Sequence, residues 1–277
     1  MKAALLQLTS GDDPAANIAA TSARFDEAVG LGAGFILTPE VTNCLSTSRT
    51  RQKEVLTREA DDETLAALRT KARDAQVWCL IGSVALKTDD PDGRFANRSF
   101  LISPDGAIAA RYDKIHMFDV QVSESEVYRE SDGYRPGDTA VTTETPFGTV
   151  GLTVCYDIRF PNLYRTLARN GAEILTVPSA FSAVTGAAHW ETLLRARAIE
   201  TGSYVLAPAQ TGTHPATRGK QRQTYGHSLA IGPWGDILAD AGEAPGVICV
   251  DLNRKDVEEA RRRIPSLRQA NRFDDPE

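Results

Sequence analysis

The residues that could do chemistry centre on Cys155, which follows a short apolar run. In that run Val150, Leu152 and Val154 alternate with other residues, which is typical of a short buried strand. Pro161 can then open a helix, because the first helical position tolerates a missing N–H. Cys155 is therefore predicted at a strand-to-helix corner, where backbone N–H groups favour a nucleophile. The alternative is a buried structural cysteine, the commoner fate of a free thiol.

Three charged residues are the other candidates. Glu40 follows the apolar run 35–38, which places it at the carboxyl edge of a buried sheet, where the sites of α/β proteins lie. Lys114 follows a predicted hairpin, and Glu130 lies in a long acidic loop. With Cys155 they form an amide-hydrolysis set, in which a thiol attacks a carbonyl, a carboxylate takes its proton and a cation stabilises the oxyanion. A carboxylate can act as the base if its environment raises its pKa.

Other interpretations remain open from spacing alone. No histidine stands beside Cys155, but the fold could bring His116 or His227 to it as the base. A serine nucleophile would need a G-x-S-x-G motif, and the nearest segment, 226–230, lies in a predicted hairpin strand. The chain could also be an inactive dimeric interaction module. Charged and nucleophilic groups at all four candidate positions argue against that function.

Alternating strands and helices are predicted to position these groups. We expect strands over 3–8, 35–38, 77–84, 150–154, 174–179, 204–209 and 247–252, hairpins over 99–112 and 227–239, and helices over 13–29, 61–75, 161–170, 189–202 and from 255. Segments 41–60 and 118–147 are expected to be loops beside the site. The residues expected to be buried are Ile18, Phe25 and Val29, then Leu65, Leu68 and Ala72, then Leu193, Leu194 and Ile199, with Cys79 and Cys249 in strands.

Both predicted hairpins carry one pattern, I-x-P-x-G-x-I-x-A, at residues 102–110 and 231–239. Together with the alternation of strands and helices, this repeat predicts an α/β fold built from two related halves that face each other. The sequence has no linker that would separate the halves, so we expect one domain over residues 1–277.

Composition excludes several classes of protein. The hydrophobic content of 42% and charged content of 25% are ordinary for a globular chain. A net charge of −6 and the lack of a basic stripe argue against a nucleic-acid partner. No apolar run approaches the roughly 18 residues that span a membrane. Widely spaced cysteines and an early polar turn at Ser10 predict a cytoplasmic protein with reduced thiols. No zinc-ligand spacing is present, so no metal is expected.

Segments 37–40, 112–116 and 151–161 resemble, in that order, the Glu, Lys and Cys motifs of the nitrilase superfamily of carbon–nitrogen hydrolases. The resemblance runs over nearly the whole chain. Segments similar to its Nit branch of ω-amidases and deaminated-glutathione amidases are 178–181, 184–186, 189–191, 195–200 and 225–228. The resemblance implies a four-layer α-β-β-α sandwich that needs no cofactor. It also implies a homodimer, with the helix after Cys155 and the helix over 189–202 at the interface.

The resemblance further implies the catalytic roles. Cys155 is the nucleophile and forms a thioester. Glu40 is the general base and then the acid that protonates the departing ammonia or amine. Lys114, with the backbone N–H of Tyr156, holds the oxyanion. Glu130 orients Lys114 or the substrate.

A small carboxylate-bearing amide is the implied substrate. Arg159, Phe181 and Thr185 match positions that hold its carboxylate end, and an arginine can grip a carboxylate with two parallel bonds. The pair 209–210 and the run 225–228 look closer to the deaminated-glutathione amidases. We therefore expect hydrolysis of deaminated glutathione to 2-oxoglutarate and cysteinylglycine. The alternative is ω-amidase action on 2-oxoglutaramate with release of ammonia.

The basic segment 219–223 is expected to influence substrate choice. It could hold a second carboxylate, such as the glycine end of a tripeptide, or form a solvated loop. The tail over 271–275 departs from the pattern of the deaminated-glutathione amidases.

Overall fold

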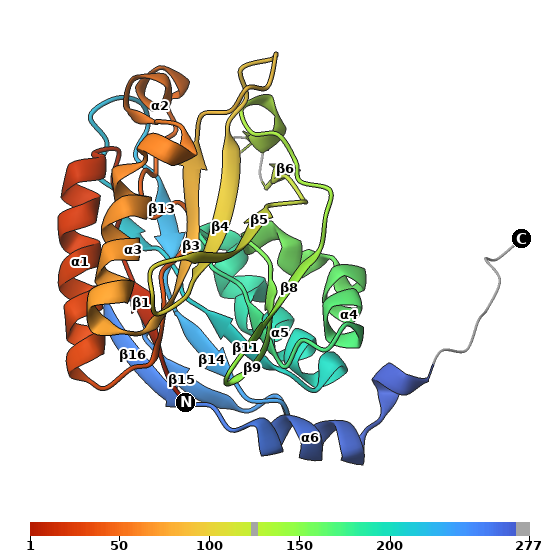
Figure 1. Cartoon of the computed structure of the whole chain (residues 1–277). Helices are drawn as coiled ribbons and strands as arrows, with labels where there is room; N and C mark the ends of the chain where they lie inside the picture. Colours follow the sequence, from red (N-terminus) through yellow and green to blue (C-terminus); the bar gives the residue numbers. More distant parts are fainter. Residues whose placement is uncertain (123–126, 270–277) are drawn as a thin grey trace, which may run out of the picture.

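Two six-stranded sheets form the centre of the computed structural model, which describes residues 1–122 and 127–269 (Figure 1). In spatial order, the first sheet contains β16 (Gly246–Asp251), β1 (Lys2–Gln7), β2 (Phe35–Leu37), β3 (Trp78–Leu86), β4 (Ala96–Ile102) and β5 (Ile108–Asp113). The second contains β15 (Ile237–Asp240), β14 (Leu229–Ile231), β11 (Tyr204–Ala207), β10 (Ile174–Thr176), β9 (Gly148–Leu152) and β8 (Val141–Thr145). Two short ribbons accompany them, β6 (Asp119–Gln121) with β7 (Val127–Arg129) and β12 (Thr211–Thr213) with β13 (Gln223–Tyr225).

Helices cover the outer faces of both sheets. Figure 1 shows α1 (Pro14–Gly30) and α3 (Glu63–Ala75) outside the first sheet, and α4 (Pro161–Arg169) and α5 (Ala183–Thr201) on the far side of the second. The side chains of β1 show why: Ala3 and Leu5 join a core cluster shared by both sheets, while Ala4 and Leu6 join the cluster under α1 and α3. The predicted α-β-β-α sandwich is confirmed.

The two halves have the same strand order. Each sheet has an antiparallel flanking strand, three parallel strands and a terminal hairpin. Both hairpins shift register at the isoleucine that begins the repeated pattern, Ile102 or Ile231. Their turn glycines, Gly106 and Gly235, adopt φ of 81° and 91°, which glycine allows without strain. The repeated sequence therefore encodes one bulged hairpin twice, which confirms the prediction of two related halves.

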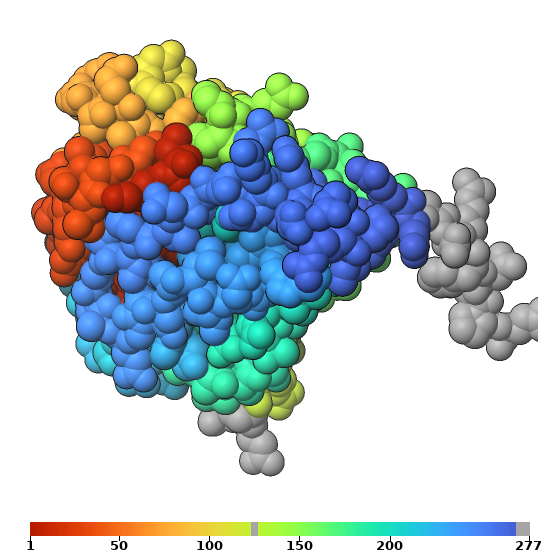
Figure 2. All heavy atoms as spheres, turned by 90° about the horizontal axis from the view of Figure 1, so that it is seen from below, coloured from red at the N-terminus to blue at the C-terminus, as the bar shows by residue number. Residues whose placement is uncertain are grey.

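The ends of the described chain meet on one face. In Figure 2, the N-terminal residues adjoin the C-terminal strand and helix, α6 (Arg254–Arg263). Met1 and Leu252 exchange backbone hydrogen bonds of 3.0 and 2.7 Å there. None of the described helices is long and apolar enough to cross a membrane. Residues 123–126 of the acidic loop and the tail over 271–275 lie outside the described residues.

The inner face of α1 is rotated by one residue from the prediction. Ile18 and Val29 are only half-buried, whereas Asn17 is buried. The Asn17 side chain bonds both backbone groups of Gly11 and the carbonyl of Asn43, at 2.8 to 2.9 Å. A polar side chain with all these partners can occupy the core, so the apolar pattern indicated the wrong face.

The long helix α5 also differs from the prediction. It begins at Ala183 rather than at 189, and Ile199 is exposed instead of buried. Arg197 occupies the inner face, where its Nε donates to Ile158 O at 2.8 Å and its guanidinium lies 5.5 Å from the Tyr164 ring centroid. The guanidinium also forms an ion pair with Glu200, and these three partners allow a charged residue to replace the expected apolar one.

Two predicted loops contain regular structure. Segment 41–60 includes α2 (Arg49–Val55) and a buried stretch at 41–45, and segment 118–147 includes β6, β7 and β8. Cys249 is only half-buried, because β16 pairs with β1 alone within its sheet. Cys79 is buried, as expected.

Gly82 permits the close approach of β3 to the segment before Glu40. A Cβ there would lie 2.0 Å from Thr38 O and 2.5 Å from Pro178 Cβ. We expect Gly82→Ala to lower the free energy of unfolding by about 1–3 kcal/mol, because backbone must move. Urea denaturation measures this change. Gly30→Ala is the control, since a Cβ there meets nothing within 4 Å, and an equal loss in both variants would contradict the close-approach explanation.

Candidate active site

Strand ends bring the candidate groups together. Glu40 follows β2 and Lys114 follows β5 in the first half, and Cys155 follows β9 in the second. Val41 and Cys155 adopt φ of 49° and 50°, left-handed values that are uncommon for residues other than glycine. Such backbone strain persists where surrounding structure holds it, typically at functional sites. The backbone N–H groups of both residues are anchored, Val41 to Ser83 Oγ at 2.8 Å and Cys155 to Pro178 O at 3.0 Å.

A buried ammonium between two carboxylates forms the middle of the site. Lys114 Nζ lies 2.9 Å from Glu40 Oε1, and 3.0 and 2.8 Å from the two carboxylate oxygens of Glu130. The exposed fraction of the side chain is 2% for Lys114, 5% for Glu40 and 15% for Glu130. Charges this deeply buried require close partners of opposite sign.

The charges of the three groups follow from this geometry. Burial acts to raise the pKa of Glu40, but the attraction and hydrogen bond of Lys114 outweigh it and leave the pKa below its usual value. Burial acts to lower the pKa of Lys114, but Glu130 and Glu40 raise it well above its usual value. Burial and the charge of Glu40 raise the pKa of the Cys155 thiol, which hydrogen-bonds Glu40. At neutral pH the site therefore holds a neutral thiol beside an ionised carboxylate.

Backbone N–H groups and one side-chain amide donate further hydrogen bonds to the carboxylates of Glu40 and Glu130. The sequence analysis did not predict these donors. Asn97 Nδ2 donates to Glu40 Oε1 at 2.9 Å, and Ala180 N donates to Glu40 Oε2 at 2.8 Å. Phe118 N donates to Glu130 Oε2 at 2.6 Å. The pairing of the hairpin strands could have indicated Asn97, because that pairing places it opposite Lys114. The backbone carbonyl of Asn97 accepts from Lys114 N at 3.0 Å.

Asp157 connects segment 112–116, which contains Lys114, to the start of the short 3-10 helix Cys155–Arg159, called the cysteine turn below. It is fully buried and accepts from Tyr112 Oη at 2.7 Å and from His116 N at 3.0 Å. It also accepts from the backbone N–H just before Cys155, at 2.8 Å. One carboxylate therefore links the segment that carries Lys114 to the segment that carries Cys155.

The alternative bases and nucleophile have other partners. His116 Nδ1 lies 2.7 Å from the buried Asp157, and the imidazole stacks on the Phe160 ring at 3.5 Å. His227 Nδ1 lies 3.1 Å from the carboxylate of Asp240. Ser228 is buried between strands, where its Oγ accepts from Ala209 N at 2.8 Å. Glu40 is the acceptor that the thiol contacts.

Three of the predicted binding residues, Tyr156, Arg159 and Phe181, lie close together at the cysteine turn. The Arg159 guanidinium lies 5.9 Å from the Tyr156 ring centroid and 5.5 Å from that of Phe181. Its Nη2 lies 3.3 Å from His189 Nδ1. Thr185 lies in the first turn of α5, and its shielded Oγ1 has no hydrogen-bond partner among residues 1–122 and 127–269. The Arg159 guanidinium can therefore bind an anion close to the segment that carries Cys155.

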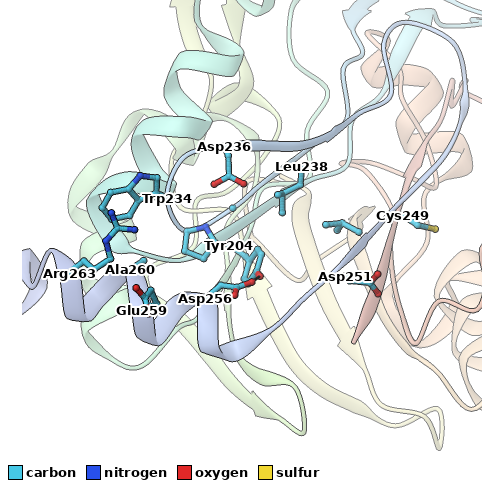
Figure 3. A pocket seen from close by; sticks show the side chains of 13 residues that line it. Tyr204, Trp234, Asp236, Leu238, Cys249, Asp251, Asp256, Glu259, Ala260 and Arg263 are labelled. Carbon is cyan, nitrogen blue, oxygen red and sulfur yellow. Dashed lines mark hydrogen bonds between the residues drawn. The ribbon is translucent and has the colours of Figure 1, made fainter.

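A separate pocket of about 560 Å³ lies between α6 and the β14–β15 turn (Figure 3). Arg263 stacks on Trp234 at its rim, with 3.8 Å between the guanidinium carbon and the ring centroid. Its lining contains none of the predicted site residues. This pocket is therefore separate from the Lys114 cluster.

The comparisons with known proteins agree with the arrangement of these groups. A family model described as carbon-nitrogen hydrolase matches residues 2–262. The chain belongs to this family. It is 42% identical over 267 residues to a deaminated glutathione amidase of Synechocystis, which covers 96% of both chains. The family resemblance seen in the motifs is confirmed, and hydrolysis of a carbon–nitrogen bond is its reaction class.

Solved structures of this family share the fold. The Caenorhabditis elegans NitFhit protein has a TM-score of 0.88 and 33% identity, over 95% of this chain and 63% of that one. Saccharomyces cerevisiae Nit3, described as a member of branch 10 of the nitrilase superfamily, has a TM-score of 0.83 and 28% identity, over 99% and 97% of the two chains.

Lys114→Met tests the buried charge cluster, because it leaves Glu40 and Glu130 without their cation. In the wild type the lowered pKa of Glu40 contributes stability that is lost as pH falls through the folded value. In the variant, burial and like charge raise that pKa, so stability is lost as pH rises. We expect a loss of about 3–5 kcal/mol at neutral pH and less in acid.

Urea denaturation at both pH values measures this difference. Lys71→Met, which breaks the surface pair of Lys71 with Asp26, is the control and should cost about 1 kcal/mol or less. A loss for Lys114→Met that does not grow from acid to neutral pH would contradict the charge assignment.

Proposed function

We propose that this carbon–nitrogen hydrolase cleaves the amide bond of deaminated glutathione to give 2-oxoglutarate and cysteinylglycine. The observation that carries the proposal is the buried ion pair of Lys114 Nζ with Glu40 Oε1 at 2.9 Å, which keeps Glu40 ionised beside the Cys155 thiol. The name of the Synechocystis relative supports the choice of amide. The segments 209–210 and 225–228 support it independently.

Acylation begins with the neutral thiol. Glu40 takes the proton of Cys155 as the sulfur attacks the amide carbonyl, and the carbonyl oxygen becomes an oxyanion. The Lys114 ammonium and the backbone N–H of Tyr156 stabilise that charge. The carbon–nitrogen bond then breaks while Glu40 returns the proton to the leaving amine. Cysteinylglycine departs and the 2-oxoglutaryl group remains on Cys155 as a thioester.

Deacylation repeats these steps with water. Glu40 removes a proton from water as its oxygen attacks the thioester carbonyl, and Lys114 again faces the oxyanion. The carbon–sulfur bond breaks, Cys155 recovers its proton from Glu40, and 2-oxoglutarate leaves. Glu130, at 2.8 Å from Lys114, holds the ammonium in place through both halves of the cycle.

Arg159 is proposed to bind the carboxylate of the 2-oxo acid. Its guanidinium lies over the aromatic faces of Tyr156 and Phe181 and has no carboxylate partner among the ion pairs of the described chain. A cation held by aromatic rings keeps its hydrogen-bond donors available for a ligand. The Oγ1 of Thr185, which has no hydrogen-bond partner among the described residues, is proposed to supply a further donor.

An ω-amidase activity is the second candidate, and the acyl side of the site favours it equally. 2-Oxoglutaramate carries the same 2-oxoglutaryl group and differs only in releasing ammonia. The two functions therefore share the nucleophile, the base and Arg159, and they differ at the leaving-group side.

Steady-state turnover of both amides tests the proposal. We expect a kcat/KM at least about tenfold larger for deaminated glutathione, because a site that bonds extra groups of the correct substrate disfavours analogues that lack them. Cys155→Ala should abolish hydrolysis, whereas Cys249→Ala, a change at a half-buried cysteine of β16, should not. A larger kcat/KM for 2-oxoglutaramate would overturn the substrate assignment.

A cytoplasmic homodimer is the proposed working form. Four free cysteines suit a reducing compartment. The outer face of α5 exposes Val184 by 61% and Ile199 by 54%, and apolar residues exposed on one helix face favour an interface.

Sedimentation velocity tests the dimer. We expect the wild type to sediment as a dimer and Ile199→Glu as a monomer, because a charge would then be buried at the interface. Leu31→Glu is the control, since Leu31 is 49% exposed at the end of α1 in the opposite layer. A dimeric Ile199→Glu variant, or a monomeric wild type, would refute this interface.

A further inference from the structure

One arginine of the basic segment 219–223 reaches the candidate active site. Arg222 is half-buried, its Nη2 donates to Ala180 O, and its guanidinium carbon lies 5.8 Å from the Tyr128 ring centroid. Its Nε is shielded from solvent and has no hydrogen-bond partner in the described part of the chain. A shielded donor without an acceptor remains available to a ligand that accepts a hydrogen bond.

A neighbouring arginine provides the comparison. Arg218 Nη1 lies 2.8 Å from Glu54, and its side chain is 54% exposed, as expected for a surface ion pair. Arg222 has no carboxylate among the ion pairs of the described residues. Segment 219–223 is therefore not simply a solvated loop, because its Arg222 turns inward, whereas Arg218, just before the segment, faces the surface.

The position of Arg222 relative to Glu40 indicates which part of a substrate it would meet. Ala180 links the two, because its N–H donates to Glu40 Oε2 at 2.8 Å and its carbonyl accepts from Arg222. The positive charge of Arg222 also helps to lower the pKa of Glu40, after the larger effects of burial and Lys114. Arg159 lies elsewhere, over the rings of Tyr156 and Phe181.

The proposed proton transfer from Glu40 to the leaving group indicates how the substrate must be oriented in the site. Glu40 must lie beside the amide nitrogen that it protonates, so the amine half of the substrate extends on the Glu40 side, where Arg222 lies. The acyl half extends towards Arg159. Resting on the proposed function, we propose that Arg222 binds a carboxylate on the amine half of the substrate and so selects amides whose leaving amine is a short acidic peptide.

Dimensions and chemistry fit a dipeptide leaving group. A two-residue peptide spans at most about 7 Å from its amino nitrogen to its carboxylate. One residue, Ala180, with a hydrogen bond on each side, separates Glu40 from Arg222. A guanidinium matches a carboxylate with two parallel donors, and four of its five N–H donors remain when one bonds Ala180 O. Ammonia, the leaving group of 2-oxoglutaramate, would leave this site unused.

Matched amides and matched variants test the proposal. In the first amide, the carboxyl group of 2-oxoglutarate that lies far from the keto group is joined to the amino group of glycylglycine. In the second amide, the same carboxyl group is joined to glycylglycinamide. The two amides therefore differ only in the charge at the end of the peptide. For the wild type we expect kcat/KM to favour the first by roughly 10- to 100-fold, the range for hydrogen bonds to a charged group. Arg222→Gln should bring this ratio close to one.

Two further variants separate binding from general damage. Arg218→Gln should keep the wild-type ratio within about twofold, because Arg218 faces the surface. Arg222→Lys, which keeps the charge but loses the fork, should give an intermediate ratio. Because each result is a ratio within one protein, a general change in Glu40 or in folded fraction cancels.

The outcomes distinguish this inference from the proposed function. A wild type that prefers 2-oxoglutaramate to deaminated glutathione contradicts the proposed function, whatever the ratio for the matched pair. A wild-type ratio near one, or an unchanged ratio in Arg222→Gln, overturns the role of Arg222 even if deaminated glutathione is the better substrate. An equal fall of the ratio in Arg222→Gln and Arg218→Gln assigns the effect to the net charge of the loop and also overturns it.

Discussion

The contact of one buried ammonium with two carboxylates is the interaction on which the rest of the site depends. Taking Lys114, Glu40 and Glu130 out of water is costly, and their mutual attraction compensates only when the remaining hydrogen-bonding sites are filled. Asn97 and the backbone N–H groups of Ala180 and Phe118 fill them. The cluster carries one negative charge in excess, and the negative charge of Glu40 raises the pKa of the Cys155 thiol, so that the resting thiol stays neutral.

The doubled fold explains how these groups can meet. Both sheets place the carboxyl ends of parallel strands at the same edge of the sandwich, but the two halves contribute different chemistry. The first half supplies the charged residues Glu40 and Lys114, while the second supplies Cys155 and the N–H of Ala180 that bonds Glu40. Asp157 joins the halves by accepting from Tyr112 of the first. A small shift between the sheets would therefore separate Glu40 from Cys155.

Features encoded within one segment were predictable from the sequence, whereas contacts between distant segments were not. The apolar run before Cys155 and the repeated hairpin pattern indicated the strands, the corner and the two halves. The inward turn of Arg222, the burial of Asn17 and the exposure of Ile199 depend on which distant backbone groups lie nearby. Polar residues with satisfied hydrogen bonds can replace apolar ones in a core, so hydrophobic periodicity alone assigns such positions to the wrong face.

The resting protonation state of Cys155 tests the central claim most directly. Infrared difference spectroscopy of the wild type minus Cys155→Ser isolates the S–H stretching band of this cysteine from those of the other three. Because Lys114 keeps Glu40 ionised and the Glu40 charge raises the pKa of Cys155, we predict a hydrogen-bonded S–H band at neutral pH that shifts when Glu40 is replaced by Gln. The absence of that band at neutral pH would mean that Cys155 is a thiolate paired with Lys114, and would contradict Glu40 as the base.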